Sequence, residues 1–67
     1  MVSLRTLSVG SIIRSIKHSK KVMKLMADAG DSFQCYEVSS VSGGRAVLDE
    51  SRFWFIPKDT MVEVATI

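Results

Sequence analysis

The sequence predicts a single α+β domain that is mostly β, an antiparallel meander of four to five strands with one basic amphipathic helix. Three observations predict this class. Apolar residues before position 30 recur with a helical period. The stretches after position 31 are instead rich in β-branched and aromatic residues, and Gly, Pro and Asp separate them into short segments. The length of 67 residues is enough for one domain only, so we treat residues 1–67 as one unit.

The helix is expected at about residues 20–29. On a helical projection the basic residues share one side, and the apolar residues share the other, except Leu25. The apolar side consists of Ile12, Ile16, Val22, Met23, Met26 and Ala27. Ser19 is a suitable N-cap and Gly30 a suitable C-terminal residue. Residues 11–16 are β-branched and fit either a strand or the first turns of a longer helix, and the sequence leaves this choice open.

Four strands are expected after Gly30, within the segments SFQCYEVSSV, RAVLD, RFWFI and MVEVATI. Turn-forming residues predict turns at residues 42–44, 49–51 and 57–60. The RFWFI strand is apolar on both faces, so we expect it to be central, with its aromatic residues in the core. The predicted core residues are Leu48, Phe53, Phe55 and Val64. Trp54 is either covered by the N-terminal segment or partly exposed as a binding anchor.

The segments VGSIIR, GDSFQCYEV, GGRAVL and FWFIPKDTMVEV, in this order, resemble the elements of small SH3-like barrels. These barrels begin with a V-G-x-x-V-R type strand and close on W-x-I-P, a short turn and a last strand. Freestanding versions of this size are often phage-encoded accessory proteins. The resemblance covers most of residues 7–64. It implies a small barrel, and the helical, basic insertion between the first strands departs from the pattern.

No enzyme signature is present, and we predict neither a cofactor nor a bound metal. His18 is the only histidine and lies in a basic stretch without a neighbouring carboxylate, which is typical of a solvated surface residue. Cys35 is the only cysteine, which excludes an internal disulfide and a Cys/His zinc site within one chain. We expect Cys35 to be a small buried apolar residue.

Localisation is predicted to be cytoplasmic. No apolar run reaches the 18 residues or so that span a bilayer, and the first ten residues lack the apolar segment of a signal peptide. A lone thiol is typical of a reducing compartment.

Charge is segregated along the chain. Residues 1–24 contain six basic residues and no acid, whereas the remainder contains three basic and seven acidic residues. The predicted partner-binding residues are Arg14, Lys17, Lys20, Lys21, Lys24 and Trp54. The leading hypothesis is a small regulatory or inhibitory protein that docks on a larger protein, such as a phage-encoded modulator of a host protein. The alternative is nucleic-acid binding through the basic helix face. An ordinary solvated face and a homo-oligomer both remain open.

Overall fold

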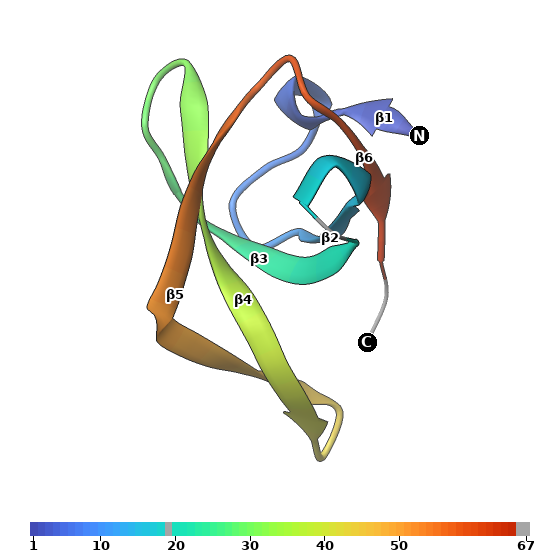
Figure 1. Ribbon diagram of the computed structural model, residues 1–67, viewed down its shortest axis with the longest axis vertical. Helices are drawn as coiled ribbons and strands as arrows, with labels where there is room; N and C mark the ends of the chain where they lie inside the picture. The colour runs from blue at the N-terminus through green and yellow to red at the C-terminus, as the bar shows by residue number, and fades with distance from the viewer. Residues whose placement is uncertain (19, 66–67) are drawn as a thin grey trace.

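The computed structural model describes residues 1–18 and 20–65, which form one antiparallel six-stranded sheet with the order β1-β6-β2-β3-β4-β5 (Figure 1). The strands are β1 (Val2–Ser3), β2 (Ile12–Ser15), β3 (Lys21–Asp28), β4 (Ser32–Ser42), β5 (Arg45–Pro57) and β6 (Met61–Val64). Two short 3₁₀ turns, η1 (Leu4–Thr6) and η2 (Ile16–His18), follow β1 and β2. The sheet curls, so that the long β4–β5 hairpin lies on one side and β6 with β1 on the other.

The core lies on the inner face of this curled sheet. Alternate residues of a strand point to opposite faces, so each inner position is followed by an outer one. The buried apolar residues are Leu4, Ile13, Met23, Leu25, Phe33, Cys35, Ile56 and Val62. Burial of Cys35 confirms the expectation that its thiol is part of the core.

The predicted α+β class with a basic amphipathic helix is wrong, as are the barrel or meander of four to five strands that belonged to it. The structure is an antiparallel β-sheet with six strands, and its described residues contain no α-helix. The segment expected as a helix is β3, in which Met23 and Leu25 are buried two positions apart. Leu25, the residue that did not fit the helical projection, fits this alternation. Residues 12–15, which the sequence left open, are strand β2.

Residues 33–64 are not a simple meander. β6 pairs with β1 and β2 rather than with the preceding β5. The turn predicted at residues 49–51 is also wrong, because β5 continues through it as a bulge. The local hydrogen bonds typical of such a turn nevertheless form. The carboxylate of Asp49 accepts hydrogen bonds from the Ser51 N–H (3.0 Å) and hydroxyl (2.6 Å).

Two predicted turns are confirmed. The β4–β5 hairpin closes at Gly43 and Gly44, with φ angles of 59° and 76° that match a type I′ turn. A second turn occupies residues 58–59, before β6.

The predicted core residues are wrong for the most part. Phe53, Phe55 and Val64 are exposed, and Leu48 is half-buried. Ile56, next to Phe55, and Val62, two positions before Val64, are the buried residues. On β5 the alternation was recognised, but the inner face is the one that carries Trp54 and Ile56. On β6, Val62 and Val64 share one face, and only Val62 is buried. In the part of the chain that the structure describes, no helix is long and apolar enough to cross a membrane.

Candidate functional site

Two exposed aromatic side chains and one half-buried one gather on the outer face of β4 and β5. We call Tyr36, Phe53 and Phe55 the outer aromatic face. Tyr36 and Phe53 are register partners with ring centroids 6.5 Å apart, and Phe53 contacts Phe55 edge to face at 6.0 Å. The phenylalanines are 51% and 57% exposed, although both are large apolar side chains. Clusters of exposed apolar residues of this kind mark binding surfaces.

Lys24 lies beside this cluster. Since Met23 and Leu25 point inward, Lys24 points to the outer face of β3. Its register partner on β4 is Tyr36, whose partner on β5 is Phe53. The sheet thus places a cation and two aromatic rings in one row across three strands, although 29 positions of sequence separate Lys24 from Phe53.

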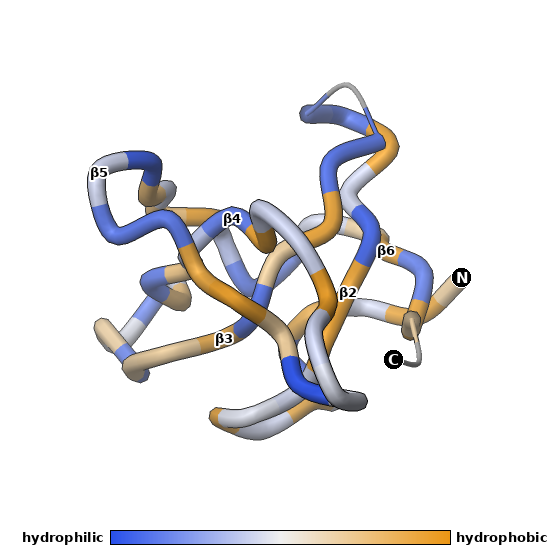
Figure 2. The backbone as a smooth tube through the Cα atoms, turned by 90° about the horizontal axis from the view of Figure 1, so that it is seen from below, coloured by the Kyte–Doolittle hydropathy of each residue, from blue (hydrophilic) through white to orange (hydrophobic). Residues whose placement is uncertain are grey.

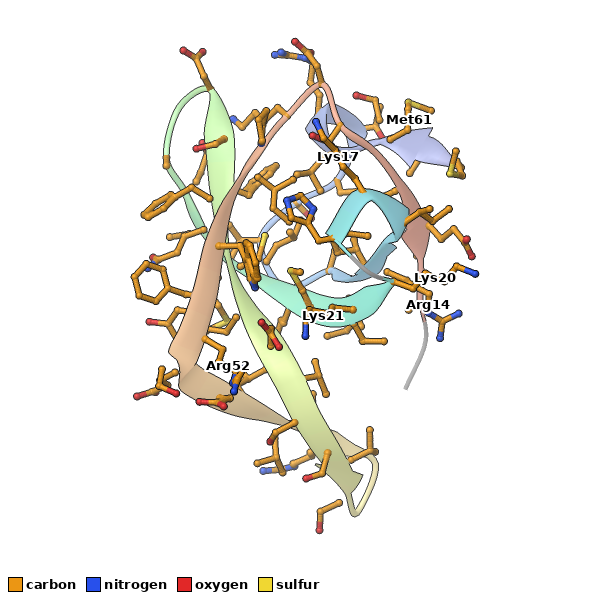
Figure 3. All side chains as sticks on the ribbon, in the orientation of Figure 1. Arg14, Lys17, Lys20, Lys21, Arg52 and Met61 are labelled. Carbon is orange, nitrogen blue, oxygen red and sulfur yellow. The ribbon has the colours of Figure 1, made fainter. Side chains whose placement is uncertain are left out.

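The other predicted basic residues do not form one face. Arg14 is exposed on β2, where its register partner is Glu63. Lys17 lies in η2, and Lys20 precedes β3 with a left-handed backbone (φ 59°). Figure 3 shows Lys17 well separated from Arg14 and Lys20. The basic helix face predicted from these residues does not exist, because they belong to the hairpin formed by β2 and β3.

Lys21 and Trp54 belong to a second group on the inner rim of the sheet, which we call the rim cluster. Its residues are Ser15, His18, Lys21, Glu37 and Trp54. The Trp54 indole N–H donates to Glu37 Oε2 (2.7 Å), and the Lys21 ammonium lies 3.4 Å from Glu37 Oε1. The hydrogen bond from Trp54, followed by Lys21, holds the pKa of the Glu37 carboxyl below its usual value, although partial desolvation opposes this shift.

Trp54 is therefore held in place rather than freely presented. It is 36% exposed, and its ring meets the His18 ring at 5.2 Å in an edge-to-face contact. His18 in turn is hydrogen-bonded through Nδ1 to the Ser15 hydroxyl at 2.7 Å. The expectation of a solvated surface histidine is wrong, because this ring is half-buried against an indole.

The Ser15–His18 pair is a structural contact. Ser15 is fully buried, so a substrate cannot reach its hydroxyl. A nucleophilic serine needs access and a base oriented by an acid, and Glu37 is bonded to Trp54 and Lys21 instead. Among the described residues, no group of three or more His, Cys, Asp or Glu side chains is placed to hold a metal ion.

Ion pairs neutralise most of the acidic residues. The four pairs within the described ranges are Arg5–Asp59, Lys21–Glu37, Arg52–Asp49 and Lys58–Asp28. They involve four of the seven acids of the chain. None of these pairs includes Arg14, Lys24 or Arg45, so their charges are available on the surface.

No protein-family model matches this chain, and comparisons with curated proteins and with solved structures found no match. These comparisons therefore do not test the resemblance to phage-encoded accessory proteins, whereas the barrel of four to five strands that it implied is not the observed fold. Tyr36, Phe53 and Phe55 were missed as candidate site residues. The sequence did contain a signal for them, because β5 is apolar on both faces and only one face can enter a core built on one side of a sheet.

Proposed function

We propose that this chain is a non-enzymatic binding module whose outer aromatic face and Lys24 bind single-stranded nucleic acid. The row formed by Lys24, Tyr36 and Phe53 carries this proposal. Proteins that bind single strands without sequence preference combine cations that follow the phosphates with aromatic side chains on which bases stack. Tyr36 and Phe53 offer rings to bases, and Lys24 lies within the same row to meet a phosphate.

Two features of the sequence argue against nucleic-acid binding, and both are weaker on the folded chain. The lysines and aromatic residues are not interleaved along the sequence, but the sheet register brings Lys24 next to Tyr36. The acidic remainder of the chain would repel a polyanion, but four of its seven acids are paired with Arg5, Lys21, Arg52 and Lys58. The remaining cations outnumber the remaining acids.

Docking on a larger protein is the second candidate, in the role of a regulatory or inhibitory protein such as a phage-encoded modulator of a host protein. The observation that favours it is the exposure of Phe53 and Phe55 on β5, which is an edge strand of the sheet. Aromatic side chains are common anchors of protein interfaces, and an edge strand can pair with a strand of a partner. We keep a cytoplasmic location as part of the proposal, because Cys35 is the only cysteine.

The test is a titration of labelled oligo-dT and oligo-U, each about twelve nucleotides long, at about 50 mM salt. We expect micromolar or tighter binding. The double variant Phe53→Ala/Phe55→Ala should weaken binding at least about tenfold, since stacking contributes about 1–3 kcal/mol per base. Both side chains are exposed, so the fold should persist.

Met61→Ala is the matched control. Met61 is also a large exposed apolar residue (46%), but it lies on β6, away from the outer aromatic face (Figure 3). This variant should bind like the parent protein. Absence of binding by the parent protein to both oligonucleotides would contradict the proposal and leave protein docking as the better candidate. Equal losses in the Met61 variant and the double variant would also contradict it.

A further inference from the structure

A groove lies between the tip of the β4–β5 hairpin and the start of the β2–β3 pair. Its volume is about 350 Å³, and its lining residues are Gly10, Ile12, Lys24, Gly44, Arg45 and Ala46. Figure 1 shows the hairpin tip extending beyond the rest of the sheet, and Figure 2 views the molecule from that end. The groove therefore combines segments that are distant in sequence, and it exists only in the folded chain.

The groove has a positive electrostatic character. Lys24 and Arg45 line it, and none of the six lining residues is acidic. Neither cation takes part in an ion pair within the described residues. Two cations that line one groove and make no ion pair among the described residues attract an anion, and the guanidinium fork of an arginine suits the oxygens of a phosphate.

The walls of the groove are also open. Gly10 on one side and Gly44 on the other carry no side chain, and a Cβ placed on either would meet nothing within 4 Å. A ligand can therefore approach the backbone closely. A volume of about 350 Å³ is at the lower end of the range for small-molecule sites, which is enough for one phosphate and its sugar.

Lys24 connects this groove to the outer aromatic face, because it lines the groove and is also the register partner of Tyr36. We propose that the groove binds one backbone phosphate of a single strand, whose neighbouring base stacks on Tyr36 or Phe53. This inference rests on the proposed function and adds the phosphate site to it. It assigns a role to Arg45, which no feature of the sequence singled out.

The test measures how affinity for oligo-dT depends on salt. Each phosphate contact contributes about 0.7 to the slope of log affinity against log salt for a single strand. Arg45→Gln should therefore lower the slope by about 0.7, and Lys24→Gln should lower it by a similar amount. Arg52→Gln is the matched control, because Arg52 is also on β5 but is paired with Asp49. Its slope should equal that of the parent protein.

The outcomes separate this inference from the proposed function. If Arg45→Gln keeps the slope of the parent protein while the Phe53→Ala/Phe55→Ala variant loses affinity, the groove inference is wrong and the proposed function stands. If the parent protein binds no oligonucleotide, the proposed function is wrong and the groove inference falls with it, because it requires a nucleic-acid strand.

Two further experiments test anion binding in the groove without an oligonucleotide. Inorganic pyrophosphate should shift the amide resonances of Gly10, Gly44 and Arg45 in the parent protein, and the shifts of Gly10 and Gly44 should be lost in Arg45→Gln. The absence of shifts at these residues contradicts the inference. A glutamate-rich peptide that binds more tightly than oligo-dT, and loses its affinity in Arg45→Gln, would instead assign the groove to an acidic protein segment.

Discussion

The indole N–H of Trp54 donates a 2.7 Å hydrogen bond to the carboxylate of Glu37, a residue 17 positions earlier in the chain. The same carboxylate lies 3.4 Å from the ammonium of Lys21. Only 12% of the Glu37 side chain is exposed. Three neighbouring strands, β3, β4 and β5, are thus joined through one carboxylate at the rim of the sheet. Trp54, expected to be either covered by the N-terminal segment or partly exposed as a binding anchor, is partly exposed, contacts His18 of that segment and has a structural role here.

Glu37 should make stability depend on pH. Its pKa in the folded state lies below the ordinary value of 4.5, because Trp54 and then Lys21 stabilise the ionised form. A lowered folded-state pKa gives a contribution that is present above the unfolded-state pKa and is lost as the pH falls through the folded-state pKa. The urea midpoint should therefore fall on acidification below about pH 4.5, and this fall should be smaller in Glu37→Gln.

The control for this prediction is Glu50→Gln, because Glu50 is exposed and makes no ion pair among the described residues. That variant should keep the acid dependence of the parent protein. Asp28 and Asp49 also have lowered pKa values, owing first to bonds from Lys58 and Ser51 respectively, so part of the dependence should remain in Glu37→Gln. An unchanged profile in Glu37→Gln would show that the bond to Trp54 does not stabilise the charged form.

Substitution of Ile56 should destabilise the fold more than substitution of Phe55. This order is the reverse of the one expected if the aromatic residues of β5 formed the core. Ile56 is fully buried, so Ile56→Ala should cost about 2–5 kcal/mol and Ile56→Val about 0.5–1.5 kcal/mol. Phe55 is 57% exposed, so Phe55→Ala should cost less than about 1 kcal/mol. Urea unfolding of the three variants measures the loss in free energy of unfolding. If Phe55→Ala proves more destabilising than Ile56→Val by several kcal/mol, the assignment of the two faces of β5 is wrong.

Cys35 should be unreactive in the native protein. Burial raises the pKa of its thiol to about 12, and the thiolate is the reactive form. An aromatic disulfide reagent at about pH 8 should modify it slowly, at a rate set by opening of the fold. In concentrated urea the same reagent should react at once. Equal rates in native and unfolded protein would show that the thiol is accessible.

The hairpin tip should tolerate only residues that accept a positive φ. Gly43 has a φ of 59°, and a Cβ there would meet no atom within 4 Å, so the cost of a substitution comes from the backbone alone. Gly43→Val should cost about 1–2 kcal/mol or more, whereas Gly43→Asn should cost less, since Asn is favoured in type I′ turns. The melting temperatures of both variants measure this. Ser42→Val, just outside the turn, is the control and should melt close to the parent protein.

The sequence by itself determined the features that depend on neighbouring residues. Gly43 and Gly44 specify a tight turn because glycine reaches its positive φ angles without strain. Asp49 and Ser51 specify a local Asx-type bond, which the structure uses for a bulge rather than a turn. The β-branched and aromatic residues after position 31 favour extended backbone, which is observed in β4, β5 and β6.

Only the tertiary structure decided which partner each segment meets. Residues 21–28 carry apolar residues that suit a helix nearly as well as a strand, and their pairing with β2 and β4 selects the strand. β5 is apolar on both faces, and a one-residue change in register would exchange them. Packing of Ile56 against the core turns Phe53 and Phe55 outward and thereby creates the outer aromatic face. The placement of Lys24 beside Tyr36 follows from the same register, because pairing between distant strands is set by the whole sheet and not by adjacent residues.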